Sequence, residues 1–216
     1  MISGEEFLEH DLSDWRYLNR GIHARFGTGD FLGSMRLAQS IATVAEEMNH
    51  HPDLDVRWGR LDVALFSHDV LGVTDRDLDL ARTISELAQA QGCTSSPFEV
   101  TVVELALDTP DLAAIQPFWV ALLGTRADPR SDDVLYDKTG QVPVLWFQPT
   151  DDHHEPRQRF HLDVFVPPEL AEERVAAAIA AGGSLVSDAE APSFWVLSDS
   201  QGNRACVCTS RDSAAE

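Results

Sequence analysis

A short polar run at positions 92–97, Gly-Cys-Thr-Ser-Ser-Pro, separates two stretches that differ in their pattern of apolar residues. Residues of these types join secondary structure elements rather than build them. The chain has 216 residues, which is more than one small domain needs and enough for two. We therefore expect two domains, at residues 1–92 and 99–210, each with its own hydrophobic core.

The first stretch alternates between strand and helix patterns. Residues 15–18 and 22–26 are typical of two strands joined by a turn, and residues 61–65 alternate as a further strand does. Apolar residues recur at helical spacing from 32 to 48, after Asp30 as a helix cap. Thr74 and Asp77 form a capping box for a second helix, which Gly92 ends. This order predicts an α+β fold with helices on one face of an antiparallel sheet.

The second stretch contains one arrangement twice. A strand at 100–107 and a helix at 112–123 precede strands near 134–136 and 144–147. The same order then returns, with a strand at 160–166, a helix that opens at Pro168, and strands near 184–186, 194–197 and 205–209. Two units of strand, helix and several strands predict a duplicated βαβββ domain.

The charge of the chain excludes several classes of partner. Its 36 acidic and 16 basic residues give a formal net charge of −20, a field that repels phosphate backbones. No apolar run approaches the roughly 20 residues of a membrane helix, and the start of the chain has no signal-peptide pattern. Three cysteines are an odd count that does not suggest a disulfide framework. We expect a cytoplasmic protein with neither nucleic acid nor membrane as a partner.

A histidine cluster carries the clearest chemical signal. Glu46 precedes the triplet His50-His51-Pro52, and His68 follows later. Imidazole has an ordinary pKa of about 6.5, so it can donate or accept a proton near neutral pH, as a dehydratase requires. Two other interpretations stay open on these residues alone. The histidine pair could simply end a helix, where the dipole favours a cation, or the histidines and Glu46 could bind zinc.

The same stretch resembles the pterin-4a-carbinolamine dehydratase family, also called 4a-hydroxytetrahydrobiopterin dehydratases, over about residues 5–91. The family signature is an acidic residue, three positions, then His-His-Pro, followed by an aromatic residue, a third histidine and an aspartate. These positions are occupied here by Glu46, His50-His51-Pro52, Trp58, His68 and Asp77.

The resemblance implies metal-free dehydration of a 4a-hydroxytetrahydropterin to the quinonoid dihydropterin, with the pterin as substrate and no cofactor, in a homo-oligomer. It implies a catalytic set of His50, His51 and His68. Within this set His51 is the main acid/base, His68 is its partner across the pterin, and His50 binds or orients the ring. The implied substrate-binding residues are Glu46, Trp58, Ser67, Arg76 and Asp77. A purely structural capping role explains Asp77 equally well.

Residues 99–209 resemble the glyoxalase/bleomycin-resistance superfamily, also called vicinal oxygen chelate. The resemblance rests on the segments 105–108, 118–124, 159–163 and 199–203. It implies a cup of strands that can hold a divalent metal, with Glu104 and His161 at ligand positions. Cys206 stands near the usual glutamate of the last strand, and Gln148 is a candidate fourth ligand. A metal-free cup that binds a small molecule is the alternative. The acidic and histidine-rich run at 151–155 is expected to be an exposed loop.

Two functions compete. The first is a pterin dehydratase fused to a small-molecule-binding cup. The second is a glyoxalase- or bleomycin-resistance-type binding protein, or a metal-dependent enzyme, in which the N-terminal domain is only a dimerisation scaffold.

Overall fold

The computed structural model describes residues 1–102, 104–129, 131–137, 139–151, 161–166, 170–209 and 211. The chain divides into two compact units, Met1–Val102 and Val103–Glu216, which are treated separately below. Within the described ranges, no helix combines the length and the apolar character that crossing a membrane requires.

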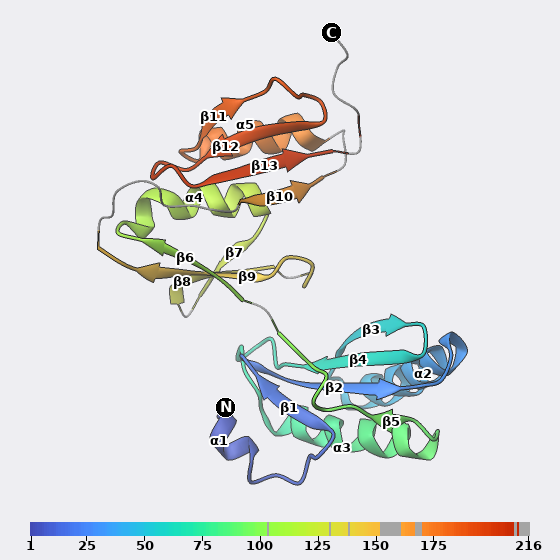
Figure 1. The fold of residues 1–216 in the computed structure, drawn as a ribbon. Coiled ribbons are helices and arrows are strands. Elements are labelled where there is room, and N and C mark those ends of the chain that lie inside the picture. Colours follow the sequence, from blue (N-terminus) through green and yellow to red (C-terminus); the bar gives the residue numbers. More distant parts are fainter. Residues whose placement is uncertain are drawn as a thin grey trace. The chain divides into compact units, whose positions relative to one another are not determined.

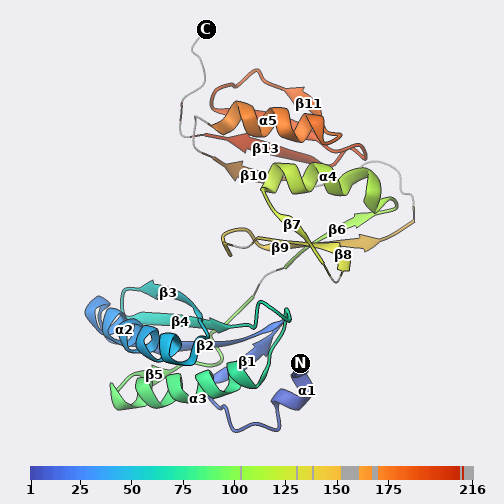
Figure 2. The same cartoon turned by 180° about the vertical axis from the view of Figure 1, so that it is seen from behind.

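The N-terminal unit is an antiparallel sheet covered on one face by two helices, as the sequence predicts (Figures 1 and 2). The sheet order is β1-β2-β4-β3, with a short β5 beside β2. The strands are β1 (Trp15–Leu18), β2 (Gly21–Gly27), β3 (Asp53–Arg57) and β4 (Arg60–Leu65), and the helices are α1 (Gly4–Phe7), α2 (Phe31–Met48) and α3 (Asp75–Ala90).

Side-chain and backbone caps fix where the two long helices begin and end. The Asp30 carboxylate accepts a hydrogen bond from the amide of Gly33 at 2.6 Å, which starts α2 as predicted. Asn49 closes α2 in the left-handed conformation, with φ 48°, and the His50 amide donates to the Ala45 carbonyl at 3.0 Å. This closure turns the chain out of the helix at His50. The capping box of Thr74 and Asp77 starts α3, again as predicted.

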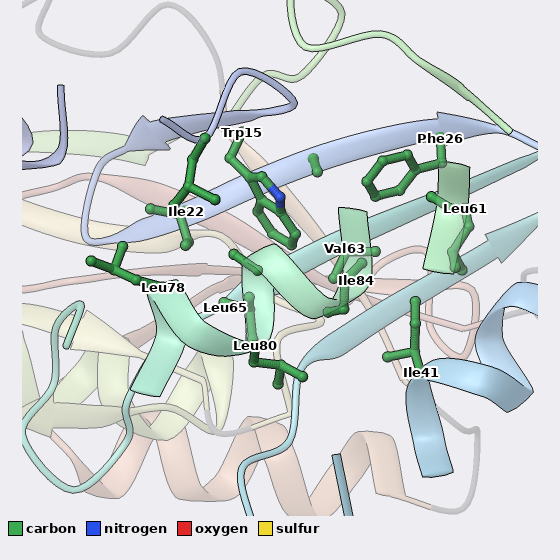
Figure 3. Packing of buried hydrophobic residues seen from close by; sticks show 14 of the residues in the cluster. Trp15, Ile22, Phe26, Ile41, Leu61, Val63, Leu65, Leu78, Leu80 and Ile84 are labelled. Carbon is green, nitrogen blue, oxygen red and sulfur yellow. The ribbon is translucent and has the colours of Figure 1, made fainter. Parts of the chain in front are cut away.

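The core of this unit lies between the sheet and the helices (Figure 3). Side chains from the strands meet side chains from both helices, and each is at most 2% exposed. They include Trp15, Ile22, Phe26, Leu61, Val63 and Leu65 from the strands, Ile41 from α2, and Leu78, Leu80 and Ile84 from α3. Burying a large aliphatic or aromatic side chain contributes about 1.5–3 kcal/mol. The core therefore holds the end of α2, the end of β4 and the start of α3 at fixed positions.

Two elements of this unit differ from the sequence prediction. The expected linker contains β5 (Thr94–Ser95), which pairs with β2 through Phe26 and Ser95. Because β1 pairs with β2 only from Gly21 to Ala24, the last residues of β2 offer a free backbone edge there. The short helix α1 was not predicted, although Ser3 and Glu6 form a capping box that signals it.

The C-terminal unit repeats one βαβββ arrangement twice and so confirms the predicted duplication. Each half forms a four-stranded mixed sheet in which the first strand lies parallel to the last, in the orders β6-β9-β8-β7 and β10-β13-β12-β11. The first half contains β6 (Glu104–Thr109), α4 (Leu112–Leu123), β7 (Arg126–Asp128), β8 (Ser131–Tyr136) and β9 (Val144–Pro149). The second contains β10 (Leu162–Phe165), α5 (Ala171–Ala180), β11 (Ser184–Ser187), β12 (Phe194–Ser198) and β13 (Arg204–Cys208).

Some boundaries in this unit differ from expectation. The strand predicted at 100–107 is observed at Glu104–Thr109, and β7 was not predicted. Phe160 and Pro168, where a strand and a helix were expected to begin, lie outside the described residues. Helices α4 and α5 share a single hydrophobic core with both sheets. Within that core, the Trp119 indole donates to the Asp199 carboxylate at 3.1 Å.

Candidate functional site

Asp77 lies at the centre of a buried hydrogen-bond network in the N-terminal unit. Its side chain is fully buried, and its Oδ2 accepts from the Ser67 hydroxyl at 2.6 Å and from the Thr74 amide at 2.7 Å. The Thr74 hydroxyl also donates to Oδ2, at 3.1 Å. Oδ1 lies 2.7 Å from Nε2 of His50. One carboxylate therefore joins the end of α2, the residues after β4 and the start of α3.

His50 is the buried member of the histidine pair. It is 7% exposed. A carboxylate oxygen only accepts hydrogen bonds, so the Nε2 atom of His50 carries the proton that points at Asp77. This bond fixes both the tautomer and the orientation of the ring. The sequence places His50 among the catalytic residues, and in the structure its ring is buried against the Asp77 carboxylate.

His51 and His68 remain exposed at the same end of the sheet. The side chain of His51 is 55% exposed, and its Nε2 lies 3.3 Å from Oε1 of Glu46. The exposed His68 packs edge-on against Phe66, with ring centroids 5.3 Å apart. Asp53 pairs with Ala64 in the antiparallel register, so extending that register by two residues sets His51 opposite Phe66. Both imidazoles are therefore presented beside the end of β4.

Two contacts hold the loop that carries His68. The Ser67 amide donates to the Gly72 carbonyl at 3.0 Å, and Leu71 adopts the left-handed conformation with φ 54°. Arg76 donates to Asp69 at 2.6 Å, and this bond lowers the pKa of the Asp69 carboxyl. Arg76, which was expected to bind substrate, is therefore engaged in closing the loop next to His68.

Trp58 is not brought to the histidines. It lies in the turn between β3 and β4 and is 79% exposed. The whole length of β3 separates it from Pro52 and His51, because Asp53–Arg57 runs from one to the other. Two hollows in this unit, of about 430 and 680 Å³, lie along residues 4–17 and along α2 with Gln91 and Cys93. The three histidines line neither hollow.

His23, on β2, is a further histidine of this unit that the sequence did not single out. It lies in a row across the sheet with Ala64 and Asp53, on the face opposite to the buried Ile22 and Ala24. Burial lowers the pKa of the His23 imidazole, which keeps the ring neutral near pH 7. The strand alternation of residues 22–26 assigns His23 to this face from the sequence alone.

The C-terminal unit contains a separate cluster of three potential ligands. One side-chain donor atom each from His161, Asp163 and Cys206 lie within 4.8 Å of one another. His161 and Asp163 form an ion pair at 3.2 Å, with each side chain about half exposed. Burial and the neighbouring Asp163 raise the pKa of the Cys206 thiol to about 11. His161 was a predicted ligand, whereas Asp163 was not.

The other predicted metal candidates are not placed in this cluster. The side chain of Glu104, like residues 152–155 of the expected exposed loop, lies outside the described part of the chain. Gln148 is exposed on β9, in the other sheet. Asp163 was overlooked because it belongs to a strand pattern in which it is simply the polar alternate residue.

Comparison with known proteins matches the two units to two different families. A family model described as pterin 4 alpha carbinolamine dehydratase matches residues 3–87, and one described as a glyoxalase-like domain matches residues 104–208. A protein of Thermosynechococcus vestitus, named provisionally as a pterin-4-alpha-carbinolamine dehydratase, is 41% identical over 78 residues, covering 36% of this chain and 82% of that protein. A protein of Metallosphaera sedula with the same provisional name is 42% identical over 76 residues, covering 35% and 79%.

Solved structures are similar to each unit. A transcriptional coactivator/pterin dehydratase from Brucella melitensis is 30% identical, with a TM-score of 0.39, and covers 40% of this chain and 97% of its own. A glyoxalase/bleomycin resistance protein/dioxygenase family enzyme from Burkholderia phytofirmans is 19% identical, with a TM-score of 0.40, and covers 49% and 95%.

Proposed function

This chain belongs, through its N-terminal domain, to the pterin-4a-carbinolamine dehydratase family, and we propose that it dehydrates a 4a-hydroxytetrahydropterin to the quinonoid dihydropterin. In this reaction the bond between C4a and the hydroxyl oxygen breaks. The oxygen leaves as water after gaining one proton, while the neighbouring ring nitrogen loses one proton and forms a double bond to C4a. The reaction therefore requires one proton donor and one proton acceptor near the ring.

His51 and His68 are the proposed donor and acceptor. Both are exposed, both lie beside the end of β4, and each follows directly after a residue of the buried Asp77 network. His51 is the main acid/base, and Glu46 lies beside its Nε2, where it can orient the ring. His68 acts from the other side of the pterin. Positioned acid/base groups of this kind contribute about 10²- to 10⁴-fold to a rate.

The buried network is the observation that supports this proposal most strongly. His50, Ser67 and Asp77 come from three separate segments and are held by bonds of 2.6–2.7 Å. Such a network keeps the neighbouring His51 and His68 at a fixed separation, and positioning of catalytic groups is a major part of enzymatic rate enhancement. We assign His50, Ser67 and Asp77 to positioning and reserve direct proton transfer for the two exposed histidines.

The decisive experiment is a stopped-flow assay with a 4a-hydroxytetrahydropterin as substrate. We expect His51→Ala and His68→Ala each to lower kcat by about 10²- to 10⁴-fold. The control is His10→Ala, because His10 lies in the turn after α1, outside the network. Circular dichroism of each variant establishes that the fold is retained.

The opposite result would favour the competing function. If the intact wild-type chain shows no dehydration above the uncatalysed rate, or if both variants match His10→Ala, the N-terminal domain is a scaffold.

For the C-terminal glyoxalase-like domain we propose a cup that binds a small molecule, on the basis of its duplicated fold and family match. Assembly into a homo-oligomer and a cytoplasmic location stay predictions.

A further inference from the structure

The ring of His68 is held by an aromatic contact, whereas the ring of His51 is held by a polar one. The Glu46 carboxylate lies 3.3 Å from the Nε2 atom of His51 and can orient that imidazole. Within the described ranges, the side chain of His68 forms no hydrogen bond and no ion pair, and its ring contacts the ring of Phe66. The two ring centroids lie 5.3 Å apart, and the two ring planes meet at 83°. These values are typical of a favourable edge-to-face aromatic pair.

The residue between the two rings fixes the backbone of both. The Ser67 amide donates to the Gly72 carbonyl at 3.0 Å, and the Ser67 hydroxyl donates to the buried Asp77 carboxylate at 2.6 Å. The side chain of Ser67 therefore points inward. Because successive side chains of an extended chain point to opposite sides, Phe66 and His68 both turn to the other side, where their rings meet.

Gly21 allows Phe66 to lie close against the sheet. A Cβ atom at Gly21 would lie 3.9 Å from the Cβ of Phe66 and only 3.1 Å from the carbonyl oxygen of Leu65. The bare backbone at the start of β2 thus accommodates the end of β4 and the side chain that follows it. Phe66 is half-buried as a result, and it offers His68 a support that is itself packed against the sheet.

We propose that Phe66 is a positioning residue for His68, a role that rests on the proposed dehydration. An imidazole that transfers a proton must point its nitrogen at the reacting atom, and an unsupported side chain is distributed over several rotamers. The edge-to-face contact favours one of these orientations. An aromatic pair of this kind changes an equilibrium by about 2- to 12-fold, so Phe66 contributes a factor of about this size to kcat while taking no proton itself.

Stopped-flow dehydration by the full-length chain tests this role with two variants of Phe66. Phe66→Leu keeps an apolar side chain but removes the ring, so we expect kcat to fall about 2- to 12-fold while KM stays unchanged. Phe66→Tyr keeps the ring and should keep kcat. The matched control is Phe31→Leu, since Phe31 is 48% exposed and begins α2, at the other end of that helix from His50. We expect this control to leave kcat unchanged.

A double-mutant cycle separates an effect through His68 from a general loss of structure. In a His68→Ala background the aromatic contact is already absent, so Phe66→Leu should lower kcat no further. Proton NMR gives a readout that does not depend on dehydration, because the ring current of Phe66 displaces the imidazole CH signals of His68. His68→Ala identifies these signals. We expect them to move toward the positions of free histidine in Phe66→Leu and to stay displaced in Phe66→Tyr.

The outcomes distinguish the role of Phe66 from the proposed function itself. An active wild-type chain whose kcat or His68 signals are unchanged in Phe66→Leu would overturn the role of Phe66 and leave the proposed function standing. An equal fall of kcat in the His68→Ala background, or a fall in Phe66→Tyr as large as in Phe66→Leu, would do the same. A wild-type chain without dehydration above the uncatalysed rate would refute the proposed function, and the role of Phe66 with it.

Discussion

Replacing Asp77 by Asn probes the buried network with the smallest change in shape. Asn keeps the size of the side chain but has only one acceptor oxygen and no charge. The oxygen can stay opposite the Ser67 hydroxyl and the Thr74 amide, which now bond to Oδ2. The new amide group then faces His50, whose Nε2 carries the proton in the native chain. His50 must adopt its other tautomer or lose its partner.

The cost follows from the burial of the bond between His50 and Asp77. The two side chains are 8% and 0% exposed, so water screens their interaction little. A hydrogen bond to a charged group contributes about 1.5–3 kcal/mol, and removing one partner of a fully buried ion pair costs about 3–5 kcal/mol. Because Asn retains the bonds of Oδ2, we expect a loss of about 2 kcal/mol, which corresponds to roughly a 30-fold change in the unfolding equilibrium.

Hydrogen exchange read by mass spectrometry is the suitable assay, because the chain has two units and peptides from α3 report on the N-terminal one. Amides in the middle of α3 should exchange roughly 30-fold faster in Asp77→Asn. Asp79→Asn is the matched control, since Asp79 lies on the same helix, is 63% exposed and pairs with Arg82. We expect that control to cost no more than about 0.5 kcal/mol. Equal exchange in the two variants would refute the reasoning.

Three further predictions concern pH, packing and metal. Burial lowers the pKa of the His23 imidazole, so the unfolded chain binds a proton at this ring more readily than the folded chain does. The free energy of unfolding therefore decreases as the pH falls below 6.5. His23→Gln should flatten that decrease in acid titrations followed by circular dichroism. In Gly183→Ala the new Cβ would overlap the buried Phe118 ring, so we expect a loss of about 1–3 kcal/mol in denaturant unfolding. Chelating divalent metal with EDTA should leave the rate of dehydration unchanged in the stopped-flow assay, because the proposed proton transfers use only imidazole groups.

The N-terminal fold could be predicted from the sequence because its signals are local. The cap at Asp30, the capping box of Thr74 and Asp77, and the alternation along β4 each act within a few residues. β5 could not be predicted in this way. Thr94 and Ser95 have no strand pattern of their own, and they become a strand only because the end of β2 leaves its backbone edge unpaired on that side.

The sequence does not show which of the two adjacent histidines is buried. The motif contains His50 and His51 as equals, and only the closure of α2 at Asn49 makes one buried and the other exposed. Trp58 was included because its position in the sequence fits the family pattern. The hairpin carries it to the far end of β3, which spacing along the chain does not reveal. Asp163 escaped notice because its neighbour Cys206 lies 43 positions away, across a parallel strand pair.

The spacing of the histidine motif has a structural cause in the hairpin that lies inside it. His51 precedes β3 and His68 follows β4, and the two strands pair residue for residue from Asp53 with Ala64 to Arg57 with Arg60. Adding equal numbers of residues to both strands would move the turn at Trp58 and Gly59 outward and leave both histidines where they are. The segment from Ser67 to Asp77 has no such freedom, because hydrogen bonds of Ser67 and Thr74 to Asp77 close it. The separation between the third histidine and the aspartate is therefore the part of the motif that the geometry of the site constrains most tightly.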